Sequence, residues 1–158
     1  MEEKNKIQLF EDKRIRTAWN DETEEWYFSI IDVIEVLTDS REPRRYWSDL
    51  KNKLKDEGNQ LYDKIVRLKM TARDGKSRLT DVANEAELLR IIQSIPSPKA
   101  EPFKMWLAQV GKERIDETID PELAIDRALS TYLRKGYTKE WINQRLQAIQ
   151  VRKELTDE

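Results

Sequence analysis

Basic side chains gather in the second quarter of the chain, where they could bind a polyanion. Residues 41–80 contain twelve Lys and Arg against six Asp and Glu, a net charge of +6, whereas the whole 158-residue chain carries −2. Residues 1–40 carry a net charge of −6. A basic segment inside an acidic protein can meet a polyanion only through one face of the molecule. The alternative is that these charges simply solvate exposed helix faces.

Most residue types that enzymes use for catalysis are missing. The chain contains no Cys and no His, which removes thiolate nucleophiles, the commonest general base and the commonest transition-metal ligand. Carboxylates with a lysine can still serve a metal-dependent nuclease, and Asp74 with Lys76, or Asp32 with Glu35, fit that chemistry. A turn already accounts for Asp74, and helix capping accounts for Asp32. We therefore expect no enzyme, no catalytic residue, no metal site and no cofactor.

Alternating apolar and polar residues predict short antiparallel strands. Three open the chain, over residues 6–10, 14–19 and 26–28, and polar turns separate them. Two more are predicted over residues 64–70 and 77–82. An Asp-Gly pair between those two favours a tight hairpin turn.

Two helices are predicted between the two groups of strands. Ser29 is expected to cap the first, over residues 30–37, with Asp32 approximating the reciprocal carboxylate of a capping box. The second is expected to begin at Pro43 and to be closed by Gly58. Its apolar residues recur at helical spacing, and they are Tyr46, Trp47, Leu50 and Leu54. Of these, Trp47 is interpreted as a core anchor rather than a platform for stacking.

Further helices are predicted towards the C-terminus. Asn84, Ser97 and Thr138 are each followed by apolar residues at helical spacing and are expected to cap three of them. Another is expected to open at Pro121 and to be closed by Gly136.

The order of the basic elements resembles a helix-turn-helix followed by a β wing. A short helix, a polar break, a basic helix and a basic hairpin follow one another along the chain. In such an arrangement the second helix enters a DNA groove and the hairpin reaches the phosphate backbone. We therefore predict that double-stranded DNA is contacted by eight basic residues, which are Arg41, Arg44, Arg45, Lys51, Lys55, Arg73, Lys76 and Arg78.

Several blocks of the sequence resemble, in the same order, the N-terminal domain of the BRO and prophage antirepressor family. They comprise the aromatic strand and helix at 26–37, the Pro-Arg-Arg start at 43–47, the hairpin at 74–80, the NE…LLRII segment at 84–92 and the Phe-Lys-x-Trp block at 97–107. The resemblance covers roughly residues 6–117. It implies a DNA-binding role and, in prophages, relief of repression. It supplies no contact residues, so those above follow from charge alone.

The predicted fold class is α+β, with small antiparallel strands and a winged-helix-like core over residues 1–117. A two-helix C-terminal extension follows over residues 118–158. Residues 120–158 resemble the extension found in bacterial relatives of DNA-damage-inducible protein D. Those relatives commonly run longer, so the sequence leaves open that the chain is part of a longer protein. The apolar side chains of Trp141, Leu146 and Ile149 predict either a homodimer or packing of the extension on its own domain.

Two functions are compatible with these features. The first is a DNA-binding transcriptional regulator or antirepressor domain that uses the basic helix and the wing. The alternative is a protein-interaction module that binds a repressor or a DNA-repair protein without contacting DNA. Its acidic turns at residues 11–12 and 21–25 would either mimic DNA or meet a basic partner. The chain has no signal-peptide pattern and no apolar run near the ~18 residues of a membrane span, so we expect a cytoplasmic protein without membrane contact.

Overall fold

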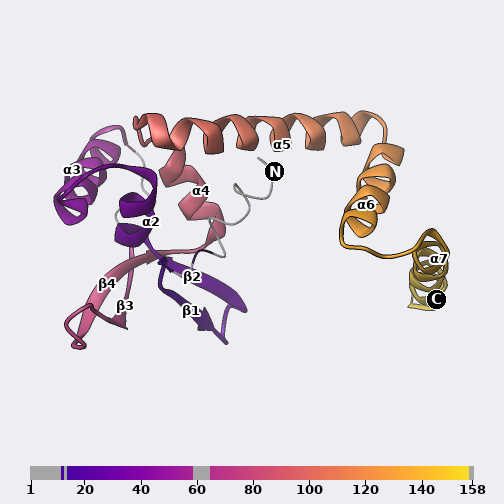
Figure 1. Cartoon of the computed structure of the whole chain (residues 1–158), viewed down its shortest axis with the longest axis horizontal. Coiled ribbons are helices and arrows are strands. Elements are labelled where there is room, and N and C mark those ends of the chain that lie inside the picture. Colours follow the sequence, from indigo (N-terminus) through magenta and orange to yellow (C-terminus); the bar gives the residue numbers. More distant parts are fainter. Residues whose placement is uncertain (1–11, 13, 59–64, 157–158) are drawn as a thin grey trace. The chain divides into compact units, whose positions relative to one another are not determined.

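Four strands form one antiparallel sheet in the order β1-β2-β4-β3 (Figure 1). They are β1 (Thr17–Asn20), β2 (Glu25–Ser29), β3 (Val66–Thr71) and β4 (Ser77–Ala83). The computed structural model describes residues 12, 14–58 and 65–156, and the strand predicted over residues 6–10 lies outside these. The predicted strand over 14–19 is found as β1, which starts three residues later and ends one residue later than expected.

The helices lie at the predicted places in the sequence, two between β2 and β3 and the others after β4. The predicted α+β class is confirmed. The bounds of the helices are α2 (Ile30–Leu37), α3 (Pro43–Asp56), α4 (Glu85–Gln93), α5 (Glu101–Ile119), α6 (Glu122–Arg134) and α7 (Lys139–Thr156). Ser97 caps a 3-10 turn, η3 (Pro98–Ala100), before α5 begins. The chain divides into two compact units, Met1–Leu107 and Ala108–Glu158. The domain boundary predicted at residue 117 remains a prediction, as does the winged-helix character of the core.

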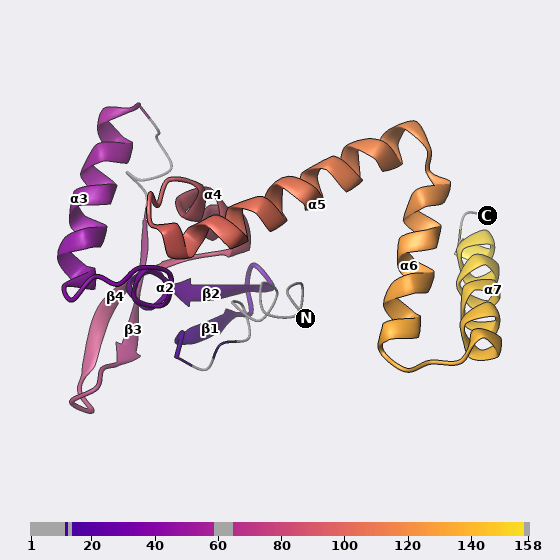
Figure 2. The ribbon, with the colours of Figure 1, turned by 45° about the horizontal axis from the view of Figure 1, so that its top comes forward.

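The sheet buries apolar side chains on both faces, following the two-residue period of its strands. Phe28 and Ala83 face the main core, which α2, α3 and α4 cover with Ile, Val and Leu side chains. Their neighbours Tyr27 and Val82 form a smaller cluster with Met70 on the opposite face. Figure 2 shows α3 beside the β3–β4 hairpin, with α2 next to it. The basic helix α3 and the basic β3–β4 hairpin therefore both rest on the same hydrophobic core.

The predicted capping box at the start of α2 is only half formed. The Ser29 hydroxyl oxygen accepts the backbone N–H of Asp32 at 3.4 Å, as expected. The backbone N–H of Ser29, however, donates to the Arg16 carbonyl at 3.0 Å and not to the Asp32 carboxylate. That carboxylate instead accepts hydrogen bonds from Arg16. Capping therefore accounts for the backbone of Asp32 but not for its side chain, which corrects the prediction.

Hydroxyl groups fix the turn between α2 and α3. The Thr38 hydroxyl donates to the Ile34 carbonyl at 2.7 Å and accepts the backbone N–H of Ser40 at 3.3 Å. The Ser40 hydroxyl in turn accepts the backbone N–H of Glu42 at 3.2 Å. This chain of bonds sets the position at which α3 starts, and with it the position of the first basic residues.

The β3–β4 hairpin turns at the predicted Asp-Gly pair. Gly75 has φ +80°, a left-handed conformation that favours glycine. The Asp74 carboxylate accepts the backbone N–H of Lys76 at 3.0 Å and a hydrogen bond from the Arg78 guanidinium at 2.6 Å. These two bonds hold the pKa of Asp74 below its usual value. Asp74 thus belongs to the turn, as the sequence indicates.

One carboxylate joins α3 to the sheet. Asp81 on β4 accepts the indole N–H of Trp47 at 2.7 Å, the Lys51 ammonium at 3.3 Å and the Arg67 Nε–H at 3.1 Å. Burial alone would raise the pKa of Asp81, but the Trp47 hydrogen bond and the Lys51 charge hold it below the usual value. Trp47 itself is buried, which confirms its predicted place in the core.

The second unit is held by few buried side chains. Among its described residues, Ile142 is the one buried hydrophobic side chain, and Glu117 is the buried carboxylate, paired with Arg127 at 2.6 Å. The Tyr137 and Trp141 rings stack with centroids 4.1 Å apart where α6 turns into α7. The Thr138 hydroxyl caps α7 as predicted, accepting the backbone N–H of Trp141. This unit leaves much of its apolar surface exposed.

The Asp81 contacts predict a pH-dependent stability. We expect Asp81→Asn to lower the free energy of unfolding at pH 7 by about 1–3 kcal/mol. The neutral amide oxygen is a weaker acceptor than the carboxylate for the hydrogen bonds from Trp47, Lys51 and Arg67. The folded-state pKa of Asp81 is depressed, so its stabilisation is full above about pH 4 and lost as the pH falls through the folded value. Urea unfolding at pH 7 and pH 3 should show a smaller difference between the wild type and the variant at pH 3.

Asp116→Asn is the matched control for this experiment. Asp116 pairs with Lys112 on the exposed surface of α5 and should contribute little to stability. Equal losses for the two variants at pH 7, or a difference at Asp81 that is as large at pH 3 as at pH 7, would contradict the assignment.

Candidate nucleic-acid interface

An open groove of about 1160 Å³ lies between the start of α3, the exposed side of α2 and the β3–β4 hairpin. Its lining is dominated by arginines that come from three separate parts of the sequence. Those residues are Arg14, Arg16, Arg41, Arg44, Arg45, Arg73 and Arg78. We call this feature the arginine groove. It brings together five of the eight residues predicted to contact DNA.

The arginine groove carries a net positive charge. Its seven arginines face four lining carboxylates, which leaves a formal charge of +3. Each of these carboxylates, Asp32, Glu35, Glu42 and Asp74, is already paired with one of the lining arginines. Within the described part of the chain, Arg41 and Arg44 have no carboxylate within ion-pair distance, and both are exposed. An anion in the groove would meet these two side chains first.

Three of the four ion pairs in the groove are exposed to solvent and therefore weak. Arg73 pairs with Glu35 at 2.5 Å while its side chain is 89% exposed, and Arg45 pairs with Glu42 at 3.7 Å. The Arg78–Asp74 pair at the hairpin is about half exposed on both sides. Pairs of this kind typically contribute about 0–1 kcal/mol. They can exchange a carboxylate for another anion at little cost.

The fourth pair forms the floor of the groove and is of a different kind. Arg16 donates to both carboxylate oxygens of Asp32, at 2.7 and 3.0 Å, and its backbone N–H donates to the same group at 2.9 Å. The guanidinium also reaches the Thr71 carbonyl at 3.2 Å and the Ser29 hydroxyl at 3.3 Å. The hydrogen bonds to Asp32 raise the pKa of Arg16 further, although burial opposes this. Arg16 thereby ties β1, α2 and the end of β3 together.

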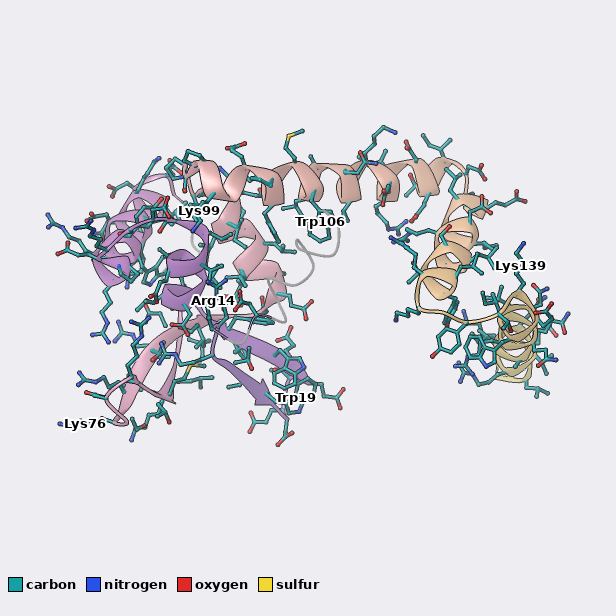
Figure 3. The ribbon with its side chains drawn as sticks, in the orientation of Figure 1. Arg14, Trp19, Lys76, Lys99, Trp106 and Lys139 are labelled. Carbon is teal, nitrogen blue, oxygen red and sulfur yellow. The ribbon has the colours of Figure 1, made fainter. Side chains whose placement is uncertain are left out.

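Three of the predicted contact residues do not line the arginine groove. Lys51 is turned towards Asp81 and the Trp47 ring, so the structure assigns it to the attachment of α3. Lys55 lies one turn further along α3, on its exposed side. Lys76 extends outward from the tip of the β3–β4 hairpin, next to the groove (Figure 3). The sequence therefore identified the basic segment from which most of the groove is built. It did not show which of the cations already have partners inside the protein.

Arg14 and Arg16 were absent from the predicted set although both line the groove. They lie in the acidic first quarter of the chain, where charge counting gave no reason to choose them. Figure 3 shows Arg14 next to α2. Its guanidinium pairs with Asp12 at 2.7 Å. The role of Arg16 could not be predicted from local sequence, because its partner Asp32 is 16 residues away along the chain.

No group of three or more His, Cys, Asp or Glu side chains within the described ranges could hold a metal ion. None of the helices described there is long and apolar enough to cross a membrane.

Comparison with known proteins identifies the domain that carries the groove. The sequence model of the "BRO family, N-terminal domain" matches residues 14–112, more than half of the chain. The chain belongs to the BRO family. No curated protein and no solved structure matches it. The match contains every residue that lines the arginine groove, so the groove is a feature of the BRO domain and not of the C-terminal helices.

The Arg16 contacts predict that the BRO domain needs an arginine at this position. We expect Arg16→Lys to lower the free energy of unfolding by about 1–3 kcal/mol, because a lysine keeps the charge but cannot supply the forked set of hydrogen bonds. Arg14→Lys is the control, since the Arg14 side chain is 74% exposed and its pair is local. It should leave the stability nearly unchanged. Thermal unfolding of both variants tests this. An Arg16→Lys variant as stable as the wild type would refute the structural role of the Arg16–Asp32 pair.

Proposed function

We propose that the BRO domain of this chain binds double-stranded DNA in the arginine groove and acts as a regulator or antirepressor of the prophage type. The observation that carries the proposal is that seven arginines from distant parts of the sequence line one open groove with a net charge of +3. Arginine forms bidentate hydrogen bonds to phosphates and to guanine. Membership of the BRO family supports a DNA-binding role at the level of the family.

The start of α3 is the part of the groove best suited to meet a phosphate. Arg44 and Arg45 lie in its first turn, after Pro43. The N-cap residue, Glu42, makes no side-chain hydrogen bond to that turn. Free backbone N–H groups and the helix dipole favour an anion there. The N-terminal residues of a recognition helix are also those that typically reach base edges.

The β3–β4 hairpin would act as the wing. Arg73 and Arg78 are held by Glu35 and Asp74 in weak, exposed pairs and can release these carboxylates for phosphates. Lys76 at the tip of the hairpin has no carboxylate within ion-pair distance among the described residues. Together with Arg41, Arg44 and Arg45, these side chains provide six cations for the backbone of a duplex.

Six phosphate contacts predict a strong dependence on salt. The logarithm of the association constant for duplex DNA should fall with the logarithm of salt concentration with a slope of about −5. Fluorescence anisotropy with a labelled duplex at several salt concentrations measures this slope. An absence of binding at low salt, or binding that salt does not weaken, would reject the proposal.

Charge reversal at the start of α3 should abolish most of the affinity. We expect Arg44→Glu/Arg45→Glu to weaken duplex binding at least about 30-fold, because each arginine contact is worth about 1–3 kcal/mol. Lys139→Glu/Arg145→Glu, on α7 and outside the BRO match, makes the same change in net charge and should weaken binding less than about threefold. Equal losses for the two variants would show that only the overall charge matters.

We further propose that the C-terminal unit mediates self-association. Its described residues include large apolar side chains that remain exposed, among them Ile119 at 82% and Leu155 at 71%. Of the residues predicted for a dimer, Trp141 is 38% exposed, whereas Leu146 and Ile149 are half-buried. A 51-residue unit with so little buried apolar surface is expected to require a partner surface.

Light scattering on the full chain tests the association. The mass should be twice 18.9 kDa, and Leu146→Glu/Ile149→Glu should reduce it to 18.9 kDa. Gln144→Glu/Gln147→Glu adds the same charge on exposed positions of α7 and should leave the dimer intact. A wild-type mass of 18.9 kDa at every protein concentration contradicts the proposal.

A further inference from the structure

The β1–β2 hairpin carries an exposed pair of tryptophans that neither the core nor the arginine groove uses. Trp19 and Trp26 face each other across the two strands, with ring centroids 5.2 Å apart in an edge-to-face arrangement. Their side chains are 46% and 47% exposed. Large aromatic side chains that remain half exposed next to each other are typical of interaction surfaces. We call these two residues the tryptophan pair.

The hairpin that carries the tryptophan pair is acidic. Residues 17–29 contain four carboxylates and no Lys or Arg. Asp21, Glu22 and Glu24 are exposed, and within the described part of the chain none of them has a cation within ion-pair distance. In contrast to the carboxylates of the arginine groove, these are not neutralised by neighbours.

The acidic surroundings continue onto the start of α4. Glu25, beside Trp26, accepts a hydrogen bond from the Asn84 side chain at 3.4 Å. Glu87, in the first turn of α4, has a raised pKa because it is partly buried and because Glu25 adds a like charge nearby. The two carboxylates therefore repel each other, and a cation bound near them would be stabilised.

The chemistry of this surface selects its partner. Carboxylates repel phosphates, so the tryptophan pair is not suited to stack nucleotide bases. An Arg or Lys side chain can lie over an indole face and meet a carboxylate at the same time. We propose that the β1–β2 hairpin is a docking surface for a protein segment rich in Arg or Lys, which binds by cation–π contact with Trp19 and Trp26 and by ion pairs with the acidic turn.

This surface is separate from the arginine groove within the BRO domain. Figure 3 shows Trp19 near the end of the β1–β2 hairpin and Lys76 at the tip of the β3–β4 hairpin, and the two hairpins point in different directions. Neither tryptophan lines the groove. The proposal therefore does not rest on DNA binding, and one surface can be disabled without the other.

A short peptide with two arginines tests the proposal on the full chain. The probe is a heptapeptide with both termini blocked so that they carry no charge. Its control is the same peptide with citrulline in place of arginine, which keeps the shape of the side chain but removes its charge. Two-dimensional NMR of the indole N–H groups reports on Trp19 and Trp26 directly. The arginine peptide should shift these two signals in a saturable way, and the citrulline peptide should bind at least about fivefold more weakly.

Variants that leave the tryptophans in place separate docking from folding. Glu22→Gln/Glu24→Gln/Glu25→Gln should weaken binding of the arginine peptide at least about fivefold while leaving affinity for duplex DNA unchanged. Glu122→Gln/Asp126→Asn/Glu140→Gln removes three carboxylates from α6 and α7 and should leave peptide binding unchanged. Equal binding of the arginine and citrulline peptides, or unaltered binding by the first variant, overturns the proposal. So does a duplex that shifts the Trp19 and Trp26 signals.

Discussion

The attachment of α3 to β4 through Asp81 is the constraint on which the groove depends. Leu50 and Leu54 hold the helix against the core, but apolar packing has little directionality and does not fix rotation of a helix about its axis. The hydrogen bonds from Trp47 and Lys51 to Asp81 are directional and come from one side of α3. By fixing the rotation of α3, these bonds set the direction in which Arg44 and Arg45, one turn earlier, face the groove.

Asp32 has the corresponding role on the other side of the groove. Its contacts with Arg16 join β1 to α2 and, through the Thr71 carbonyl, to the end of β3 where the hairpin begins. The two carboxylates show how this highly charged chain divides its charges. Buried carboxylates with several donors hold the elements together, whereas exposed ones such as Glu35 only occupy arginines loosely. At the groove, Arg45, Arg73 and Arg78 are held only by such exposed pairs, and Arg41 and Arg44 have no carboxylate within ion-pair distance among the described residues.

Local signals made most of the fold predictable from the sequence. Ser29 and Asn84 cap their helices, Pro43 starts α3, and the Asp-Gly pair forms the β3–β4 turn, because each of these preferences acts within a few residues. The site was predictable only in part. Whether Lys51 faces solvent or Asp81 depends on how α3 packs on a strand 30 residues away, and Arg16 finds Asp32 by a contact of the same long-range kind. Charge counting therefore found the basic segment but could not separate paired cations from available ones.

The most direct test of DNA binding in the groove is an NMR titration of the arginine Nε–Hε groups with a short duplex. The signals of Arg41, Arg44, Arg45, Arg73 and Arg78 should shift on addition of DNA and return when salt is added, whereas that of Arg16 should stay in place because its donors are already committed to Asp32. Shifts confined to residues outside the groove, or no shifts at low salt, would contradict the proposed interface.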